Sequence, residues 1–171
     1  MKVYHFIKPR MARIEKYRPN VGIVLFNKNA DIWIGKRADI NSESAWQMPQ
    51  GGIDINESSL KAAIREVHEE TGIESIKHIS IIDKWIKYKL PMDIAKNKWN
   101  GKYVGQMQKW YLFYFFGDDS EVNINTYKSP EFIEWKWANS KYVEENVTDF
   151  RKNIYRTVFS KFSVDIENTL N

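Results

Sequence analysis

One segment, residues 51 to 73 with the sequence GGIDINESSLKAAIREVHEETGI, constrains the fold and chemistry of this chain most strongly. Four glutamates crowd around one arginine, Arg65, in this segment: Glu57, Glu66, Glu69 and Glu70. Carboxylates held this close repel one another, so a helix gains little from them unless a positive charge lies among them. Oxygen atoms are the ligands that a hard divalent cation such as Mg²⁺ prefers. The segment therefore predicts a helix that carries a metal site.

The helix is expected over about residues 58 to 71. At about 100° per residue, Glu66 and Glu70 lie roughly 40° apart, and Glu69 lies about 60° to the other side of Glu66. The three carboxylates can therefore converge on one place. Apolar contacts for the remaining faces come from Ala62, Ala63, Ile64 and Val67.

The ends of this helix also have sequence signals. Asn56 or Ser58 is expected to cap its N-terminus. Gly72 lies where a helix commonly ends in a left-handed residue. Gly51 and Gly52 are expected to permit a tight loop that a side chain would obstruct.

Acidic runs on helices are more often solvated faces than metal sites, so the short string of residues 66 to 70 has little weight alone. The longer pattern, with Gly51, Glu57 and the run from Arg65 to Ile73, resembles the box of the Nudix hydrolase family at each defining position. That resemblance implies hydrolysis of a nucleoside diphosphate linked to another group, with Mg²⁺ or Mn²⁺ as cofactor. It implies metal binding by Glu66, Glu69 and Glu70. Arg65 would hold one of these glutamates in place, and Glu57 would support them or bind metal through water.

Further segments, at residues 17–22, 46–52, 85–91, 105–110 and 129–132, are similar to one branch of this family. That branch acts on the 5′-triphosphate of RNA and on dinucleoside polyphosphates, and the similarity covers roughly residues 17 to 160. It implies that Glu131 comes from a distant loop to bind metal or to act as general base on the attacking water. Without the resemblance, Glu131 would be read as a solvated loop carboxylate.

The same resemblance implies contacts to phosphate or RNA from four cations: Arg18, Arg37, Lys109 and Arg151. Related enzymes have a lysine where this chain has Arg151, which keeps the charge and changes the hydrogen-bond geometry. The loop between Arg37 and Trp46 is also longer than is usual in the family.

Aromatic and amide side chains complete the expected substrate side. Phe150 and Tyr88 are expected to stack on or flank nucleobases, and Gln106 and Gln108 to bond to phosphate or base edges. Phe150 also lies on an apolar helical stripe, so a core position is an equal alternative. Trp110 is expected in the core.

Composition limits the classes of function. The chain has no cysteine, which excludes disulfides and thiolate chemistry, and its net charge of +4 suits a polyanionic substrate. No apolar run is long enough to span a membrane, and no secretory signal is evident. We expect a cytoplasmic enzyme, and the sequence identifies no protein partner.

The expected layout is an N-terminal extension at residues 1–16, followed by a single domain over residues 17–171. Strands are expected at residues 21–26, 31–36, 76–85, 110–116 and 132–137, with loops at 37–43 and 89–105. A second helix is expected from about Lys141, with an apolar stripe formed by Val143, Val147, Phe150, Ile154, Val158 and Phe162. This order indicates an α/β fold, and the resemblance implies the Nudix α/β/α sandwich with a mixed β-sheet.

Three functions remain open at this stage. The first is removal of pyrophosphate from the 5′-triphosphate end of RNA, which would prepare messages for decay. The second is cleavage of dinucleoside polyphosphates such as Ap₄A by the same metal cluster. The third is a non-catalytic RNA-binding module, which the complete set of candidate ligand carboxylates disfavours.

Overall fold

The computed structural model describes residues 16–43, 45–126 and 129–171. The extension expected at residues 1–16 therefore lies outside the described residues, apart from Lys16. Within the described residues, no helix is both long and apolar enough to cross a membrane.

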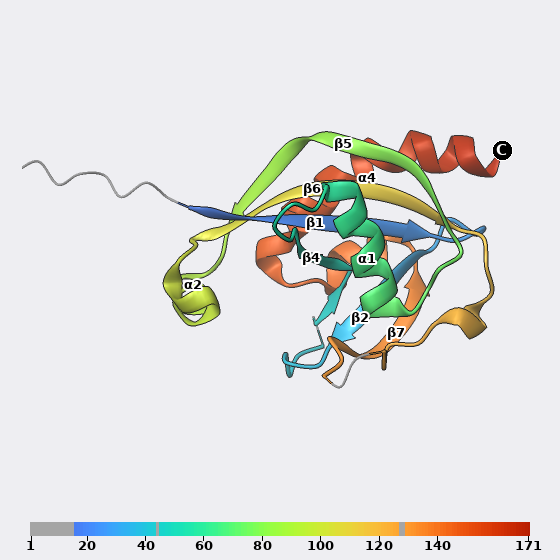
Figure 1. The fold of residues 1–171 in the computed structure, drawn as a ribbon. Coiled ribbons are helices and arrows are strands. Elements are labelled where there is room, and N and C mark those ends of the chain that lie inside the picture. Colours follow the sequence, from blue (N-terminus) through green and yellow to red (C-terminus); the bar gives the residue numbers. More distant parts are fainter. Residues whose placement is uncertain (1–15, 44, 127–128) are drawn as a thin grey trace, which may run out of the picture.

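A mixed β-sheet forms the middle of the molecule (Figure 1). Its strands are β1 (Tyr17–Phe26), β2 (Ile32–Arg37), β3 (Trp46–Gln47), β4 (Gln50–Gly52), β5 (Ile76–Lys89), β6 (Gly105–Phe115) and β7 (Phe132–Ala138). They run in the order β3-β2-β1-β6-β5, while β4 pairs with β1 and β7 pairs with β2. The pairing of β1 with β6 is parallel and the others are antiparallel.

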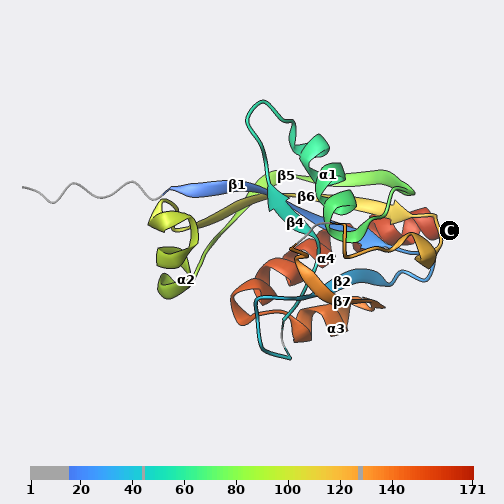
Figure 2. The ribbon, with the colours of Figure 1, turned by 60° about the horizontal axis from the view of Figure 1, so that its bottom comes forward.

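Helices cover both faces of this sheet (Figure 2). They are α1 (Ser59–Thr71), α2 (Met92–Asn97), α3 (Ser140–Asn146) and α4 (Asp149–Leu170), with short 3-10 turns η1 (Lys98–Gly101) and η2 (Asp119–Glu121). Helix α1 lies on one face, and α3 and α4 lie on the other. The order of layers is helix, sheet, helix.

Strand β1 shows why two cores form. Its buried residues alternate between the two faces, as side chains of a strand must. Val21, Ile23 and Leu25 pack into the cluster that contains α1. Val24 and Phe26 pack into the cluster beneath α4. A strand that is apolar on both sides is typical of a sheet with helices on both faces.

The expected helix over residues 58 to 71 is confirmed as α1. The Ser58 side chain accepts from the Lys61 backbone N–H as the N-cap, and Asn56 lies outside the helix. Gly72 closes the helix with φ 73°, and its N–H donates to the carbonyl of His68. Gly72 therefore has the expected left-handed conformation.

The expected strands are all present, and β1, β5 and β6 are longer than predicted, since β1 already begins at Tyr17. β5 continues to Lys89 and β6 begins at Gly105, so the segment between them is shorter than the expected loop. That segment is also not a simple loop, because it contains α2 and η1. Its partly buried residues Ile94, Ala95 and Trp99 pack against the α4-side core, which explains why it is ordered into helical turns.

The single C-terminal helix predicted from about Lys141 is wrong. Two helices are present, because Val147 and Thr148 have extended backbone between α3 and α4. Asn139 caps α3 by accepting from the Tyr142 N–H. The apolar stripe was still informative, since Val143, Val147, Ile154, Val158 and Phe162 are buried in one core.

Candidate active site

Arg65 in α1 connects the expected carboxylates. Its Nε and Nη2 donate to the two oxygens of Glu57, each at 2.9 Å. Its Nη1 donates to Glu66 at 2.8 Å and to Glu69 at 3.0 Å, and Nη2 also reaches the Gly52 carbonyl at 2.8 Å. The resemblance implied one bound glutamate, whereas the guanidinium binds three and the backbone of β4. These hydrogen bonds lower the pKa of Glu57 to about 2 and raise that of Arg65.

Glu66 lies directly against Gly51. A β-carbon on Gly51 would lie 1.8 Å from Cδ of Glu66, and one on Gly52 would lie 2.1 Å from Nη2 of Arg18. The expected tight loop at these glycines is wrong, because both belong to the extended strand β4. Their missing side chains instead leave room for Glu66 and Arg18.

Burial raises the pKa of two carboxyl groups on α1. Glu66 is 8% exposed, and desolvation raises its pKa although Arg65 acts in the opposite direction. The pKa of Glu70 is raised well above its ordinary value, first by burial and then by the charge of Glu66. Glu70 accepts from the Gln50 backbone N–H at 3.1 Å. Burial therefore disfavours the negative charge at both residues.

A small cavity of about 170 Å³ brings the carboxylates together with the segment before β7. We call it the acidic pocket, and it is lined by Glu66, Glu69, Glu70, Ile124, Thr126, Ser129, Pro130 and Glu131. The distant Glu131 thus lies in the same cavity as the α1 glutamates. The reason is strand pairing, since Arg37 of β2 is opposite Phe132 of β7, and the Ala38 N–H donates to the Glu131 carbonyl.

The carboxylates share this cavity but point toward arginines. Glu66 and Glu69 bind Arg65, and Glu131 forms an ion pair with Arg37. Within the described parts of the chain, no three acidic or histidine side chains converge closely enough to hold one ion. The predicted convergence on one place is therefore corrected to a shared cavity. The donor set nevertheless suits a hard divalent cation, because it consists of carboxylate oxygens, two of them partly desolvated and in excess of local positive charge.

Arg37 links the acidic pocket to the cationic side. Its guanidinium is buried and donates to Asp39 through Nε at 2.8 Å and Nη2 at 2.6 Å. This bond is the main reason that the pKa of Asp39 is lowered. With Glu131 on its other side, Arg37 spans from the pocket to the loop after β2.

Arg151, Phe150 and Tyr88 form a stack. Arg151 is 7% exposed, and its Cζ lies 4.8 Å from the ring centre of Phe150. The Phe150 ring stacks on Tyr88 at 6.1 Å, and the Tyr88 hydroxyl donates to Gln106. Because Tyr88 is buried and covered by Phe150, it supports its neighbours and offers no free ring to a nucleobase. Phe150 is half-buried and packs against the core, as the alternative prediction had it.

The remaining expected substrate residues separate into two places. Gln108 is buried and donates to Asn20 at 2.7 Å and to Gln50 at 3.2 Å, near the acidic pocket. Lys109 lies on the opposite face of β6 from Gln108, where it donates to the Asp83 carbonyl and lies 5.6 Å from the Trp85 ring. The structure does not bring Lys109 to the other three expected cations.

Lys98 is a residue that the sequence reasoning missed. Burial lowers its pKa first, and the positive charges of Arg37, Arg151 and Arg18 lower it further, while Asp39 opposes them. Lys98 thus lies within electrostatic reach of three expected substrate residues, although it comes from η1. Nothing in the periodicity of residues 89 to 105 indicates that this segment returns to the site.

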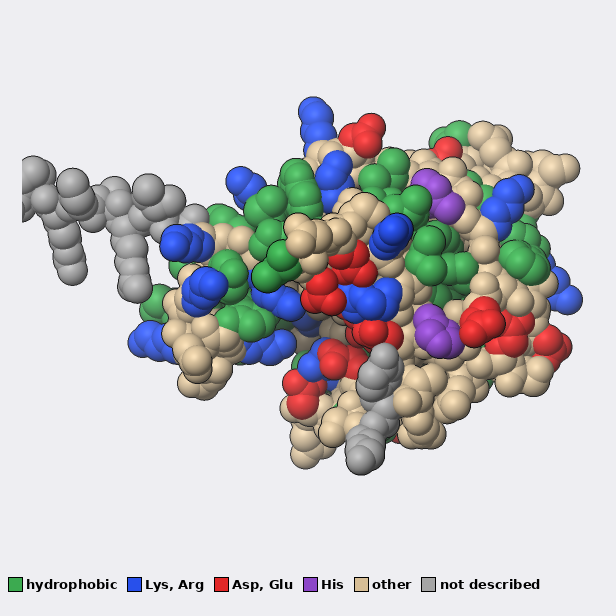
Figure 3. Space-filling model, viewed as in Figure 1, with side chains coloured by type: hydrophobic (Ala, Val, Ile, Leu, Met, Phe, Trp, Pro, Cys, Tyr) green, Lys and Arg blue, Asp and Glu red, His purple; other side chains and the backbone are tan. Residues whose placement is uncertain are grey.

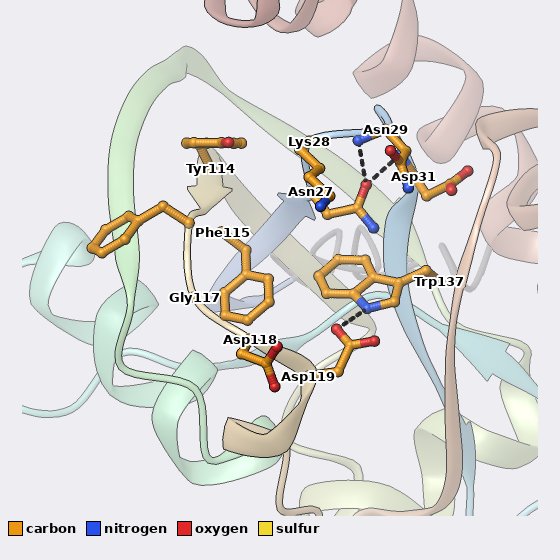
Figure 4. A pocket seen from close by; sticks show the side chains of 11 residues that line it. Asn27, Lys28, Asn29, Asp31, Tyr114, Phe115, Gly117, Asp118, Asp119 and Trp137 are labelled. Carbon is orange, nitrogen blue, oxygen red and sulfur yellow. Dashed lines mark hydrogen bonds between the residues drawn. The ribbon is translucent and has the colours of Figure 1, made fainter.

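A second cavity, of about 340 Å³, lies between the β1–β2 turn and the segment after β6 (Figure 4). Two of its polar side chains already have partners in the protein: Asn27 accepts from the N–H groups of Asn29 and Asp31, and Asp119 accepts from the Trp137 ring nitrogen. It shares no lining residue with the acidic pocket. Nothing in it points to catalysis.

Known proteins with similar sequences cover most of this chain. An RNA pyrophosphohydrolase of Wolbachia sp. subsp. Brugia malayi (strain TRS) is 46% identical over 153 residues, which cover 90% of this chain and 94% of the relative. The RNA pyrophosphohydrolase of Roseobacter denitrificans is 40% identical over 152 residues, covering 88% of this chain and 94% of the relative.

Solved structures share the fold. The dihydroneopterin triphosphate pyrophosphohydrolase of E. coli superposes with a TM-score of 0.66 at 14% identity, covering 84% of this chain and 97% of that chain. An Ap4A hydrolase of C. elegans gives a TM-score of 0.59 at 22% identity, covering 85% and 98%. At these identities the likeness concerns the fold, and it confirms the expected α/β/α sandwich. The family model of the NUDIX domain matches residues 16–158, and the chain therefore belongs to the NUDIX family.

Proposed function

We propose that this chain is a metal-dependent hydrolase that removes pyrophosphate from the 5′-triphosphate end of RNA and leaves a 5′-monophosphate. The observation that carries the proposal is the acidic pocket, where partly desolvated carboxylates of α1 meet Glu131. Relatives that share 40% to 46% identity over most of their length are named RNA pyrophosphohydrolases. In a cell this reaction would occur in the cytoplasm and prepare messages for decay.

The pocket residues would have distinct roles. Glu66, Glu69, Glu70 and Glu131 would hold Mg²⁺, or Mn²⁺, through their oxygen atoms. A divalent cation bound there supplies charge neutralisation for phosphate oxygens and a more acidic water. Arg65 and Glu57 fix the carboxylates, since Arg65 anchors them to the carbonyl of β4.

Glu131 has a second candidate role. Its carboxylate is half-exposed and lies in the same cavity as the α1 glutamates, so it can accept a proton from water at an oxygen atom. Arg37 pairs with one carboxylate oxygen of Glu131, which leaves the second oxygen for either role, and the Arg37 guanidinium would lie close to a phosphate oxygen of the substrate. The Arg37–Glu131 ion pair therefore links substrate binding to the arrangement of the pocket.

The cationic side would hold the polyphosphate and the first nucleotides. Arg18, Arg37 and Arg151 carry fixed charges, and guanidinium groups suit phosphate oxygens. The Arg151 Nε is buried and finds no acceptor among the described residues. Phe150 would flank a base, with Tyr88 and Gln106 supporting it and Gln108 near the pocket. Lys109, on the other face of β6, would contact substrate only at a distance from this group.

The test is a comparison of kcat/KM on 5′-triphosphorylated RNA and on Ap₄A under the same Mg²⁺ concentration. We expect a clear preference for the RNA, and loss of activity in Glu66→Gln and Glu70→Gln. The matched control is His68→Gln, because His68 lies on the same helix but is exposed and outside the pocket. A preference for Ap₄A would favour the dinucleoside polyphosphate as substrate, and full activity of either glutamine variant would contradict the metal assignment.

A further inference from the structure

A basic lobe projects from the ends of β5 and β6 (Figures 1 and 2). We define it as residues 92–103, which contain α2, η1 and the two residues that follow. Its charged residues are Lys96, Lys98, Lys102 and one acid, Asp93. The lobe is held at its base by a hydrogen bond from the Leu90 N–H to the Val104 carbonyl at 3.0 Å. Figure 3 shows Lys and Arg side chains gathered around α2, beside the acidic side chains near α1.

Trp99 joins this lobe to the active site. Its ring lies 5.3 Å from Cζ of Arg18 and 5.8 Å from Nζ of Lys98, and both are cation–π distances. The Tyr103 ring meets it edge-on at 5.9 Å. Arg18 in turn lies against Gly52, whose carbonyl accepts from Arg65. A continuous set of contacts thus runs from the acidic pocket through Arg18 to Trp99 and Lys98.

The backbone of the lobe is strained at this point. Trp99 has φ 51° and Asn100 has φ 53°, and Gly101 follows with φ 67°. A left-handed conformation is unfavourable for a residue with a side chain. Asparagine tolerates it better than tryptophan, so Trp99 is the more unusual of the two. Strain of this kind persists where the surroundings hold the residue in place, and it is common at ligand-binding sites.

Positive charges outnumber negative ones around Lys98. Arg18, Arg37 and Arg151 all act on Lys98, and the opposing carboxylate is Asp39, which Arg37 already binds. Lys102 lies 5.4 Å from the Tyr103 ring, and Lys87 of β5 lies 5.6 Å from the Tyr17 ring at the base of the lobe. Cations interleaved with aromatic rings are typical of surfaces that bind single-stranded nucleic acid.

We propose that the basic lobe binds the ribose–phosphate backbone of the RNA that follows the cleaved 5′ end, with Trp99 holding Arg18 and Lys98 in position. This proposal rests on the proposed function for its substrate. Arg18, beside the acidic pocket, serves the polyphosphate, and Lys98 with Lys96 and Lys102 serves nucleotides farther along the chain. The lobe lies at the end of the molecule away from α1 in both ribbon views, so RNA that leaves the pocket toward this end would pass over the lobe.

The first test is kinetic. Lys96→Gln, Lys102→Gln and the double variant Lys96→Gln/Lys102→Gln are compared with wild type on a long 5′-triphosphorylated RNA and on a triphosphorylated dinucleotide. We expect kcat/KM on the long RNA to fall about tenfold and to depend less steeply on salt concentration. On the dinucleotide, kcat/KM should change less than about twofold. Lys161→Gln, an exposed lysine of α4, is the control. Equal losses on both substrates, or no loss on either, would overturn the proposal.

The second test separates the lobe from the chemistry. Binding of a 5′-hydroxyl RNA of the same length, measured by fluorescence anisotropy, needs no triphosphate and no turnover. A plot of the logarithm of the association constant against the logarithm of the salt concentration has a negative slope. Each lysine removed should make this slope shallower by about 0.7. Unchanged binding and slope would overturn the lobe proposal even if the enzyme is active. The wild-type protein could also prove inactive while its binding of 5′-hydroxyl RNA still depends on these lysines. That result would contradict the proposed function and leave the lobe as an RNA-binding surface.

Trp99 acts as a positioning residue in this account. Trp99→Leu removes the cation–π contacts and keeps an apolar side chain, and its melting temperature shows whether the fold is kept. We expect kcat/KM on the long RNA to fall less in Trp99→Phe than in Trp99→Leu, because phenylalanine keeps an aromatic ring for the cation–π contacts. Equal activity of the leucine variant and wild type would exclude the positioning role.

Discussion

Gly51 and Glu66 are in such close contact that a β-carbon on Gly51 would lie 1.8 Å from the carboxyl carbon of Glu66. The pair explains how a short strand and a helix hold one carboxylate in a fixed place. Strand β4 provides the space, α1 provides the side chain, and Arg65 connects the two by binding both Glu66 and the Gly52 carbonyl.

Gly51→Ala is expected to displace Glu66 and reduce kcat/KM by about a hundredfold, since misplacement by about 1 Å has this effect at catalytic centres. Stability should fall by about 1–3 kcal/mol, the usual cost of overpacking. Activity assays and urea unfolding measure the two effects. His68→Ala on the same helix is the control and should match wild type. Wild-type activity of the alanine variant would show that Glu66 need not occupy this position.

Glu70→Gln is expected to make the metal-free protein more stable at neutral pH. Burial raises the pKa of Glu70, so its ionisation opposes folding once the pH exceeds the ordinary value of 4.5. The difference in stability between Glu70→Gln and wild type should therefore close as the pH falls below 4.5, where Glu70 is protonated in both the folded and the unfolded state. Thermal melts between acidic and neutral pH measure this gap. A glutamine variant that is less stable than wild type at neutral pH would contradict the burial argument.

Mg²⁺ is expected to stabilise the wild type and not the Glu70→Gln variant. A ligand at ten times its Kd raises the free energy of unfolding by about 1.4 kcal/mol if it binds the native state alone. Melting temperatures with and without Mg²⁺ measure the effect, and Ca²⁺ serves as a comparison ion. Equal stabilisation of both proteins would place the bound ion away from Glu70.

Glu57→Gln is expected to remove a pH-dependent part of the stability. Hydrogen bonds from Arg65 lower the pKa of Glu57 from 4.5 to about 2. A lowered pKa stabilises the native state above 4.5, and this contribution is lost as the pH falls from 4.5 to about 2. The difference between wild type and variant should shrink over that range in denaturant titrations. Glu74→Gln, at a highly exposed position, should show no such change.

Tyr155→Phe tests the core beneath the site. The Tyr155 hydroxyl accepts from the buried Met48 N–H at 2.9 Å, so the variant should lose about 1–3 kcal/mol by leaving that donor unpaired. Burial raises the pKa of Tyr155 from 10.0 to about 12, so the wild type loses stability as the pH rises through this range, and the phenylalanine variant does not. The difference in the free energy of unfolding between wild type and Tyr155→Phe should narrow from pH 10.0 to about 12. A constant gap would exclude this titration.

The local elements could be predicted from the sequence because their signals are local. The α1 helix has a capping serine, an apolar face and a terminal glycine, and all three lie within the helix or next to it. The apolar stripe from Val143 to Phe162 identified buried residues correctly. Periodicity could not detect the break at Val147 and Thr148, because residues on both sides of the break pack into the same core.

The composition of the site depends on tertiary contacts that no local pattern contains. Glu131 reaches the acidic pocket because β7 pairs with β2, and Lys98 reaches the cationic side because Trp99 packs on the core. The glycines of β4 looked like loop residues, since a sequence does not show which side chain will fill the space above them. Lys109 was placed with the other cations by resemblance, but strand alternation directs it to the opposite face of β6.

The most direct measurement uses RNA labelled at the γ-phosphate of its 5′ end, incubated with Mg²⁺ and either wild type, Glu66→Gln or His68→Gln. The account predicts labelled pyrophosphate, or phosphate released in two steps, with a 5′-monophosphate RNA from wild type and from the histidine variant. Glu66→Gln should release no label while melting as a folded protein. An RNA that keeps its triphosphate with the wild-type protein, or equal release by Glu66→Gln, would contradict the claim that the acidic pocket performs this hydrolysis.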